Sequence, residues 1–214
     1  MGHAGMAAAA VRYLRSAGAP VAAGPVETLP RPELRAVGAD ERAPVDHGEF
    51  RRVLGHFATG VTVITAPEVP GEAAGTGPAG FACQSFSSLS LDPPLVCFMA
   101  GRTSTTWPRI ARAGVFCVNV LGAHQGDLCR GFAVSGADKF AGVEYDAAPV
   151  SGSPRLAGTA AWIDCTIHAV HTGGDHLIVV GRVDALGTGD GGGDAHAGDG
   201  AGVPPLLFHR GRFV

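Results

Sequence analysis

The feature that most restricts the fold of this chain is a pair of long β-type segments joined by a glycine-rich turn. Residues 160–172, AAWIDCTIHAVHT, alternate with the period of two that a half-buried strand requires. One side carries Trp162, Asp164, Thr166 and His168, and the other carries Ile163, Cys165, Ile167 and Ala169. A Gly-Gly-Asp turn at 173–175 then leads into HLIVVGRVDAL, residues 176–186. The pattern predicts a long β-hairpin with one face toward a core.

Shorter segments are also typical of strands, and only short helices separate them. The strand candidates are residues 61–65 (VTVIT), 80–87, 95–99 (LVCFM), 115–121 (VFCVNVL) and 204–214. Short helices are expected over 103–114 and 124–133. Because the chain shows no run of alternating βα units, we predict a mainly β fold, a barrel with short flanking helices.

Residues 46–60 predict a helix at the start of the ordered region. Its apolar residues repeat at helical spacing and share one face: Phe50, Val53, Leu54 and Phe57. Asp46 is a good N-cap, Glu49 three residues later completes an acidic variant of the capping box, and Gly60 is expected to end the helix.

One folded domain is expected from residue 45 to residue 214. Residues 1–44 are rich in Ala, Gly, Pro and Arg without a sustained period, which predicts a disordered or loosely ordered extension. Residues 187–203 are almost all Gly, Asp and Ala, which predicts a flexible insert.

Charge and composition exclude several classes of protein. A net charge of −3 and a pI near 6.3 give no basic surface for nucleic acid. The apolar run of residues 6–11 is too short for a signal peptide, and no stretch reaches the length of a membrane helix. The five cysteines are an odd number and include no C-x-x-C pair, which predicts reduced thiols and a cytoplasmic location.

The motifs of several enzyme classes are missing from the sequence. The chain has no P-loop, no G-x-G-x-x-G between a strand and a helix, and no G-x-S-x-G. His168, His171 and His176 lie close in sequence, but residues three apart on a strand point to opposite faces. We therefore expect no metal site.

Two hydroxyl-rich stretches remain as candidate binding sites. GFACQSFSSLSLDPPL, residues 80–95, places four serines among large apolar residues. These serines either surround a ligand with many hydrogen-bonding atoms or face water on an edge strand, and their spacing alone does not decide between the two. TSTT, residues 103–106, begins a predicted helix, where hydroxyls and unpaired amides suit a phosphate group. Ordinary N-capping explains one or two of these hydroxyls equally well.

Several motifs together resemble the flavin reductase-like family, which has the FMN-binding split β-barrel fold with Greek-key-like connections. They are FRRVLGHFATGVTVIT, GFACQSFSSLSLDPPLVCF, FCVNVL, DKFAGVEY and GGDHLIVVGRV, in this order. The resemblance covers residues 48–214 apart from the glycine-rich insert. It is strongest to the reductase components of two-component flavin-dependent monooxygenases that act on aromatic compounds.

The resemblance implies a set of binding residues. The wall of the flavin ring would be formed by Pro78, Ala79, Gly80, Phe81, Ala82, Gln84, Ser85, Met99, Ala100 and Gly101. The ribityl phosphate would lie at Ser104, Thr105 and Thr106, where this chain has only hydroxyls, with Arg102 and Arg109 on either side. The nicotinamide cofactor would contact Gly173, Gly174, Asp175 and His176, with His176 as the one titratable group in a catalytic position. Asn119 and residues 209–213 are further candidates beside the flavin.

The implied activity is hydride transfer from NADH, with NADPH as the alternative, to FMN or FAD. The reduced flavin would then pass to a separate monooxygenase, and the reductase would be a homodimer. A different reading of the same fold remains open, namely a flavin- or haem-binding module without enzymatic activity. The GGDH segment favours the enzyme, because a module that only binds flavin has no need of a nicotinamide site.

Overall fold

The long hairpin predicted from the sequence lies inside the main sheet. β9 (Ala161–Gly173) and β10 (His176–Thr188) pair antiparallel, and His176 lies opposite Gly173. Gly174 has a φ of +68°, a value that glycine adopts without strain and that the first central position of a type II′ turn requires. The prediction of a hairpin is confirmed.

The computed structural model describes residues 45–69, 71, 77–136, 138–189 and 203–214. The extension expected over residues 1–44 lies outside the described residues, and so does most of the insert expected over 187–203. The beginning of that insert is corrected, because β10 continues to Thr188.

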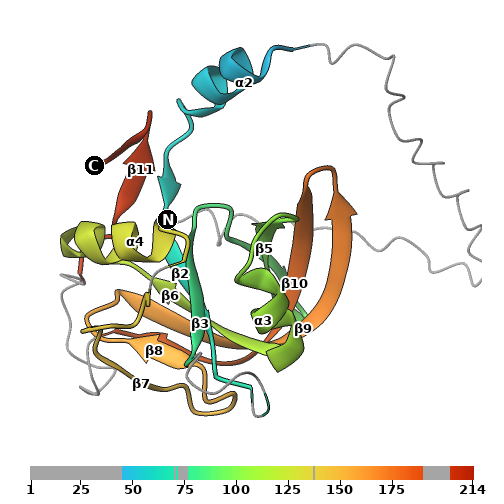
Figure 1. The fold of residues 1–214 in the computed structure, drawn as a ribbon, viewed down its shortest axis with the longest axis vertical. Coiled ribbons are helices and arrows are strands. Elements are labelled where there is room, and N and C mark those ends of the chain that lie inside the picture. Colours follow the sequence, from blue (N-terminus) through green and yellow to red (C-terminus); the bar gives the residue numbers. More distant parts are fainter. Residues whose placement is uncertain (1–44, 70, 72–76, 137, 190–202) are drawn as a thin grey trace, which may run out of the picture. The chain divides into compact units, whose positions relative to one another are not determined.

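A seven-stranded antiparallel sheet carries the fold. Its order is β3-β2-β6-β9-β10-β5-β4, and Figure 1 shows β5 beside the rising hairpin of β9 and β10. The five strands besides the hairpin are β2 (Thr62–Ala66), β3 (Ala79–Cys83), β4 (Ser87–Leu91), β5 (Pro94–Gly101) and β6 (Val115–Val120). β3 and β4 are the two edge strands of this sheet. They are consecutive in the chain and are joined by residues 84–86.

Two small sheets accompany the main one. β1 (Thr59–Gly60) pairs with β11 (Leu207–His209), which pairs with β12 (Arg212–Phe213). The C-terminal segment was expected to be one strand and is instead a tight hairpin. β7 (Tyr145–Ala147) and β8 (Pro154–Leu156) form the second small sheet.

The helices are short, as predicted, but two of their boundaries differ. α2 (His47–Leu54) ends at Gly55 and not at Gly60, because residues 59–60 pair with β11. α3 (Trp107–Ala113) begins only at Trp107, so residues 103–106 precede the helix. η1 (Ala123–Gln125) and α4 (Gly126–Ala133) occupy the third predicted position.

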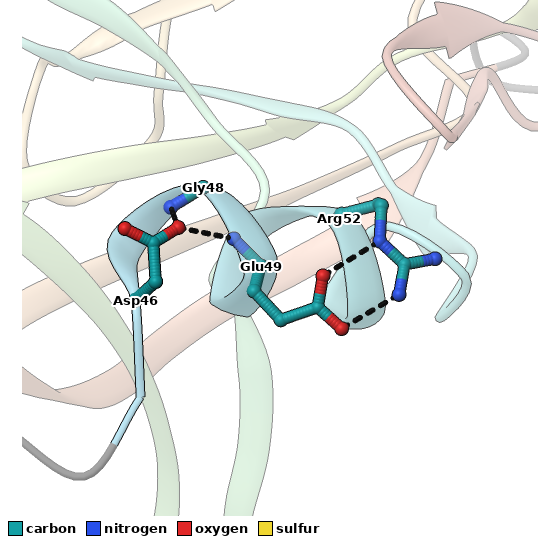
Figure 2. A network of polar contacts seen from close by, with 4 residues as sticks. All are labelled: Asp46, Gly48, Glu49 and Arg52. Carbon is teal, nitrogen blue, oxygen red and sulfur yellow. Dashed lines mark hydrogen bonds and ion pairs between the residues drawn. The ribbon is translucent and has the colours of Figure 1, made fainter.

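The N-terminus of α2 confirms the predicted cap in part (Figure 2). The carboxylate of Asp46 accepts hydrogen bonds from the backbone N–H groups of Gly48 and Glu49, at 2.8 and 3.0 Å. The carboxylate of Glu49 does not return to the cap residue but pairs with Arg52 one turn later. Only half of the expected capping box is therefore formed.

Two apolar clusters form the core. The larger one packs α3 against the sheet, and the rings of Phe98 and Phe116 meet edge to face at 5.1 Å. Gly181 of β10 packs against the ring of Phe116. A side chain does not fit at this position, because an added Cβ would lie 2.3 Å from the Phe116 Cζ atom. The smaller cluster packs Phe132 of α4 against Val63 of β2.

Candidate functional site

A cleft of about 550 Å³ lies where β3, β5 and the turn of the β9–β10 hairpin come together. It contains many of the residues that the sequence assigned to the flavin and nicotinamide: Phe81, Ala82, Gln84, Ser85, Met99, Gly101, Ser104 and His176. Three separate segments of the chain therefore converge on one site. β5 pairs with β10, which brings Met99 and Gly101 beside His176. Gln84 and Ser85 directly follow β3 and lead into β4, the other neighbour of β5.

The side chain of Ser85 forms hydrogen bonds with the backbone of β5 beside the cleft. β4 pairs with β5 only as far as Ser87 opposite Cys97, so the outer edge of β5 has no strand partner at Met99. The hydroxyl of Ser85 takes that place: it accepts from the Met99 N–H at 2.9 Å and donates to the Met99 carbonyl at 3.2 Å. Both residues line the cleft.

The other serines of the same stretch lie elsewhere. Ser87, Ser88 and Ser90 belong to β4, the edge strand, where the first two are exposed and Ser90 is half-buried. None of them lines the cleft. Both readings of the serine cluster are thus realised: Ser85 lies at the candidate ligand site, and the next three serines follow an edge strand.

His176 reaches the cleft from the hairpin turn. Register places it opposite Gly101, and a Cβ added to Gly101 would lie 3.9 Å from His176 Nε2. The absence of a side chain at Gly101 therefore leaves space in front of the imidazole. The backbone N–H of Arg102 donates to the Asp175 carbonyl at 3.0 Å. The fold thus brings one arginine to this turn.

A smaller cavity of about 250 Å³ lies next to the cleft along the chain. Gly80 and Thr105 line this cavity, while their neighbours Phe81 and Ser104 line the cleft. Pro78 and Thr106 also line the smaller cavity, as do two cationic residues, Arg109 and Lys139. The sequence placed only hydroxyls between Ser104 and Trp107, with Arg109 as a flanking residue. The fold adds Lys139 to this cavity, together with one acidic residue, Asp138.

Lys139 also connects two walls of the site. Its ammonium group donates to the carbonyls of Gly80 in β3 and Phe132 at the end of α4, both at 3.1 Å. Partial burial lowers the pKa of Lys139 from its usual value. A cation at the C-terminus of α4 is also favoured by the helix dipole.

The prediction that a helix begins within residues 103–106 is wrong, because α3 begins at Trp107. α3 has only seven residues, and Thr106, its N-cap, makes no capping hydrogen bond with its side chain. The cap is supplied by Ser104, whose hydroxyl accepts from the Trp107 N–H at 3.1 Å. Ser104 is therefore already used by the chain, whereas Thr105 and Thr106 line the small cavity.

Some predicted site residues line neither cavity. Ala79 and Ala100 are buried, with 2% exposure each. Asn119 is fully buried: its amide donates to the carbonyls of Val63 and Pro154 and accepts from the Leu156 N–H at 2.8 Å. This arrangement supports the view that Asn119 satisfies buried backbone groups and does not contact a flavin. Gly173, Gly174 and Asp175 form the turn behind His176.

Sequence reasoning missed several residues of the cleft. Cys83 and Cys129 line it, as do Val61, Ala133 and Phe208; Phe213, from the predicted closing segment, lines it as well. Burial raises the pKa values of both thiols. Only the closing segment of residues 209–213 had given a signal, through its place in the family pattern. Cys83 lies between Ala82 and Gln84 in the predicted flavin wall but was not assigned to it, and the remaining residues come from elements distant from that wall in sequence.

The chain matches a family model described as the flavin reductase like domain over residues 54–214. The chain belongs to this family. One relative is the reductase subunit HsaB of a flavin-dependent monooxygenase from Rhodococcus jostii. It is 43% identical over 182 residues, which cover 85% of this chain and 84% of that protein. A flavin reductase of Pseudomonas putida is 44% identical and is covered to 91%.

Solved structures of flavin reductases share the fold. Nitrilotriacetate monooxygenase component B from Mycobacterium thermoresistibile superposes with a TM-score of 0.67 at 43% identity, over 78% of this chain and 84% of that one. The NADH:FAD oxidoreductase SgcE6 of Streptomyces globisporus, solved with NAD and FAD fragments, gives 0.67 at 35% identity, over 79% and 92%. The mainly β split-barrel fold expected from the sequence is confirmed.

Proposed function

We propose that this flavin reductase transfers hydride from NADH to FMN or FAD and supplies the reduced flavin to a separate monooxygenase. The single observation that carries the proposal is the convergence of the β3 wall, the β5 wall and His176 on one cleft. When bound, a flavin supplies the reactive chemistry by accepting hydride at N5 from nicotinamide C4. The residues of the chain have to bind, orient and shield the two rings.

The cleft has the character that a flavin ring requires. Two of its walls are β3 along Phe81–Cys83 and the end of β5 at Met99 and Gly101, and Gly101 brings no side chain into the space. Apolar side chains of Phe208 and Phe213 line the same cleft. Apolar walls with a few backbone hydrogen-bonding groups are typical of sites for planar cofactors.

The smaller cavity fits the flavin phosphate. Thr105, Thr106, Arg109 and Lys139 line it, and Asp138 is the one acidic residue in its wall. The Lys139 ammonium has three donors, and the carbonyls of Gly80 and Phe132 take two of them. We propose that the third donor serves a phosphate oxygen, so that FMN and FAD bind better than riboflavin.

We further propose that the protein is a homodimer. α2 buries none of its side chains, and Phe50, Val53, Leu54 and Phe57 are each more than half exposed. A largely apolar cavity of about 650 Å³ beside α2 shares Gln84, Ser85 and Phe208 with the flavin cleft. A second copy would cover this surface and would enclose the cleft from that side. Light scattering of the wild type and of Phe57→Ser would test it, with a monomeric wild type as the contrary outcome.

A cytoplasmic location is also proposed. All five cysteines are free thiols, which fits a reducing compartment. Among the described residues, none of the helices has the length and apolar character needed to cross a membrane.

The deciding experiment is steady-state oxidation of NADH, and then of NADPH, followed by absorbance with added FMN, FAD or riboflavin. We expect oxidation that requires flavin and saturates with it, with NADH as the better donor. Flavin binding without oxidation by any pair would instead support the non-enzymatic binding module.

A further inference from the structure

Asp175 and His176 form a hydrogen-bonded pair at the hairpin turn. The Asp175 Oδ1 and His176 Nδ1 atoms are 2.8 Å apart. The two side chains differ in position: that of His176 is 49% exposed and lines the cleft, whereas that of Asp175 is 94% exposed and does not line it. The hydrogen bond therefore joins a residue of the cleft to a carboxylate that is not part of the cleft lining.

The backbone at this turn is fixed on both sides. Gly174 and Asp175 are the two central residues of the turn, and the Asp175 carbonyl accepts from the Arg102 N–H at the end of β5. On the other side, His176 pairs with Gly173 of β9 and so closes the hairpin. The Asp175 carboxylate is thus held on a rigid turn and not on a free loop.

The direction of the hydrogen bond follows from the charge of Asp175. The hydrogen bond from His176, and next the nearby positive charge of the same ring, lowers the pKa of the Asp175 carboxyl. An ionised carboxylate only accepts hydrogen bonds, so His176 Nδ1 must carry the proton that is shared. In the neutral ring Nε2 then holds a lone pair, and Nε2 is the atom on the Gly101 side.

We propose that Asp175 is a positioning residue, which acts on the nicotinamide only through His176. By holding Nδ1–H it fixes the tautomer and the ring orientation, so that Nε2 accepts a hydrogen bond from the carboxamide of the nicotinamide. This inference rests on the proposed function for the identity of the ligand. It differs from the expectation that all four residues of the GGDH segment contact NADH directly.

A double-mutant cycle separates the two possibilities. We expect Asp175→Ala to raise the KM for NADH about threefold, the effect of one lost hydrogen bond between exposed side chains, while the Kd for flavin stays within twofold. In the His176→Ala background the same change should have no further effect. Asp175→Asn should recover most of the loss, because the amide oxygen still accepts from Nδ1–H. Asp146→Ala is the matched control, since it removes an exposed carboxylate that pairs with Arg155 on the β7–β8 hairpin.

A second measurement does not depend on turnover. Nitrogen-15 shifts of the imidazole, assigned among the nine histidines by comparison with His176→Ala, report the tautomer directly. We expect the Nδ1-protonated form in the wild type and a shift toward the Nε2-protonated form in Asp175→Ala.

The outcomes are distinguishable. Equal effects of Asp175→Ala in both backgrounds would overturn the proposal, because Asp175 would then act without His176. An unchanged tautomer in Asp175→Ala would overturn it as well. An absence of NADH oxidation in the wild type would instead remove the proposed function, and the nitrogen shifts would still decide whether Asp175 fixes the ring.

Discussion

Ser85→Ala is the most informative single change at the cleft. The hydroxyl of Ser85 makes two hydrogen bonds to the backbone of Met99, at a position where β4 no longer pairs with β5. The substitution removes both bonds without adding bulk. We expect the Gln84–Ser85 corner to separate from β5 and the flavin wall to lose its fixed shape.

The size of the effect follows from the two bonds. Each contributes about 0.5–1.5 kcal/mol net, and water can replace part of that because Met99 is 37% exposed. The expected loss is about 1.5 kcal/mol in the free energy of unfolding, or about 4 °C in Tm for a domain of this size. If about 1 kcal/mol of this is required to order the wall on binding, the Kd for flavin rises about fivefold.

The assay pairs flavin titration by fluorescence with urea unfolding. Ser87→Ala is the matched control: its hydroxyl is exposed, donates only to the neighbouring Ser88 carbonyl at 3.0 Å, and does not line the cleft. We expect Ser87→Ala to leave both quantities unchanged. Equal effects of the two substitutions, or an unchanged flavin Kd in Ser85→Ala, would refute the reasoning.

Three further changes test other parts of the site and core. Lys139→Met should reduce the preference for FMN over riboflavin about tenfold in binding titrations, because a charged partner of the phosphate is lost; an unchanged preference would exclude that contact. Asn119→Leu leaves the buried Leu156 N–H unpaired and should cost about 3 kcal/mol in urea unfolding, with little effect on flavin Kd in the folded protein. The reverse pattern would place Asn119 at the flavin. Burial, reinforced by the Asp164 carboxylate, raises the pKa of Cys117 to about 12. Since the folded value lies above the unfolded one, stability should be intact below about pH 9 and decline toward pH 12, and Cys117→Ala should make that decline shallower by about 1.4 kcal/mol per pH unit.

Local signals predicted much of the fold. The alternation over residues 160–172 and the Gly-Gly-Asp turn determine the β9–β10 hairpin, since side-chain period and turn chemistry act between near neighbours. Asp46 determines the start of α2 in the same way. The end of α2 could not be predicted, because residues 59–60 pair with β11, about 150 positions later in the chain.

The residues of the candidate site also fall into two groups, those that local sequence patterns identified and those that only the tertiary structure revealed. The sequence by itself identified the segments around Ser85, Met99 and His176, through hydroxyl and glycine patterns and a family resemblance that belong to each segment alone. Only the tertiary structure decided that Ser85, and not its neighbouring serines, closes the sheet at Met99, and that Lys139 reaches the cavity beside Thr105. The physical reason is that a partner distant in sequence leaves no periodic or turn signal. Its contact exists only once the sheet order has brought the two segments together.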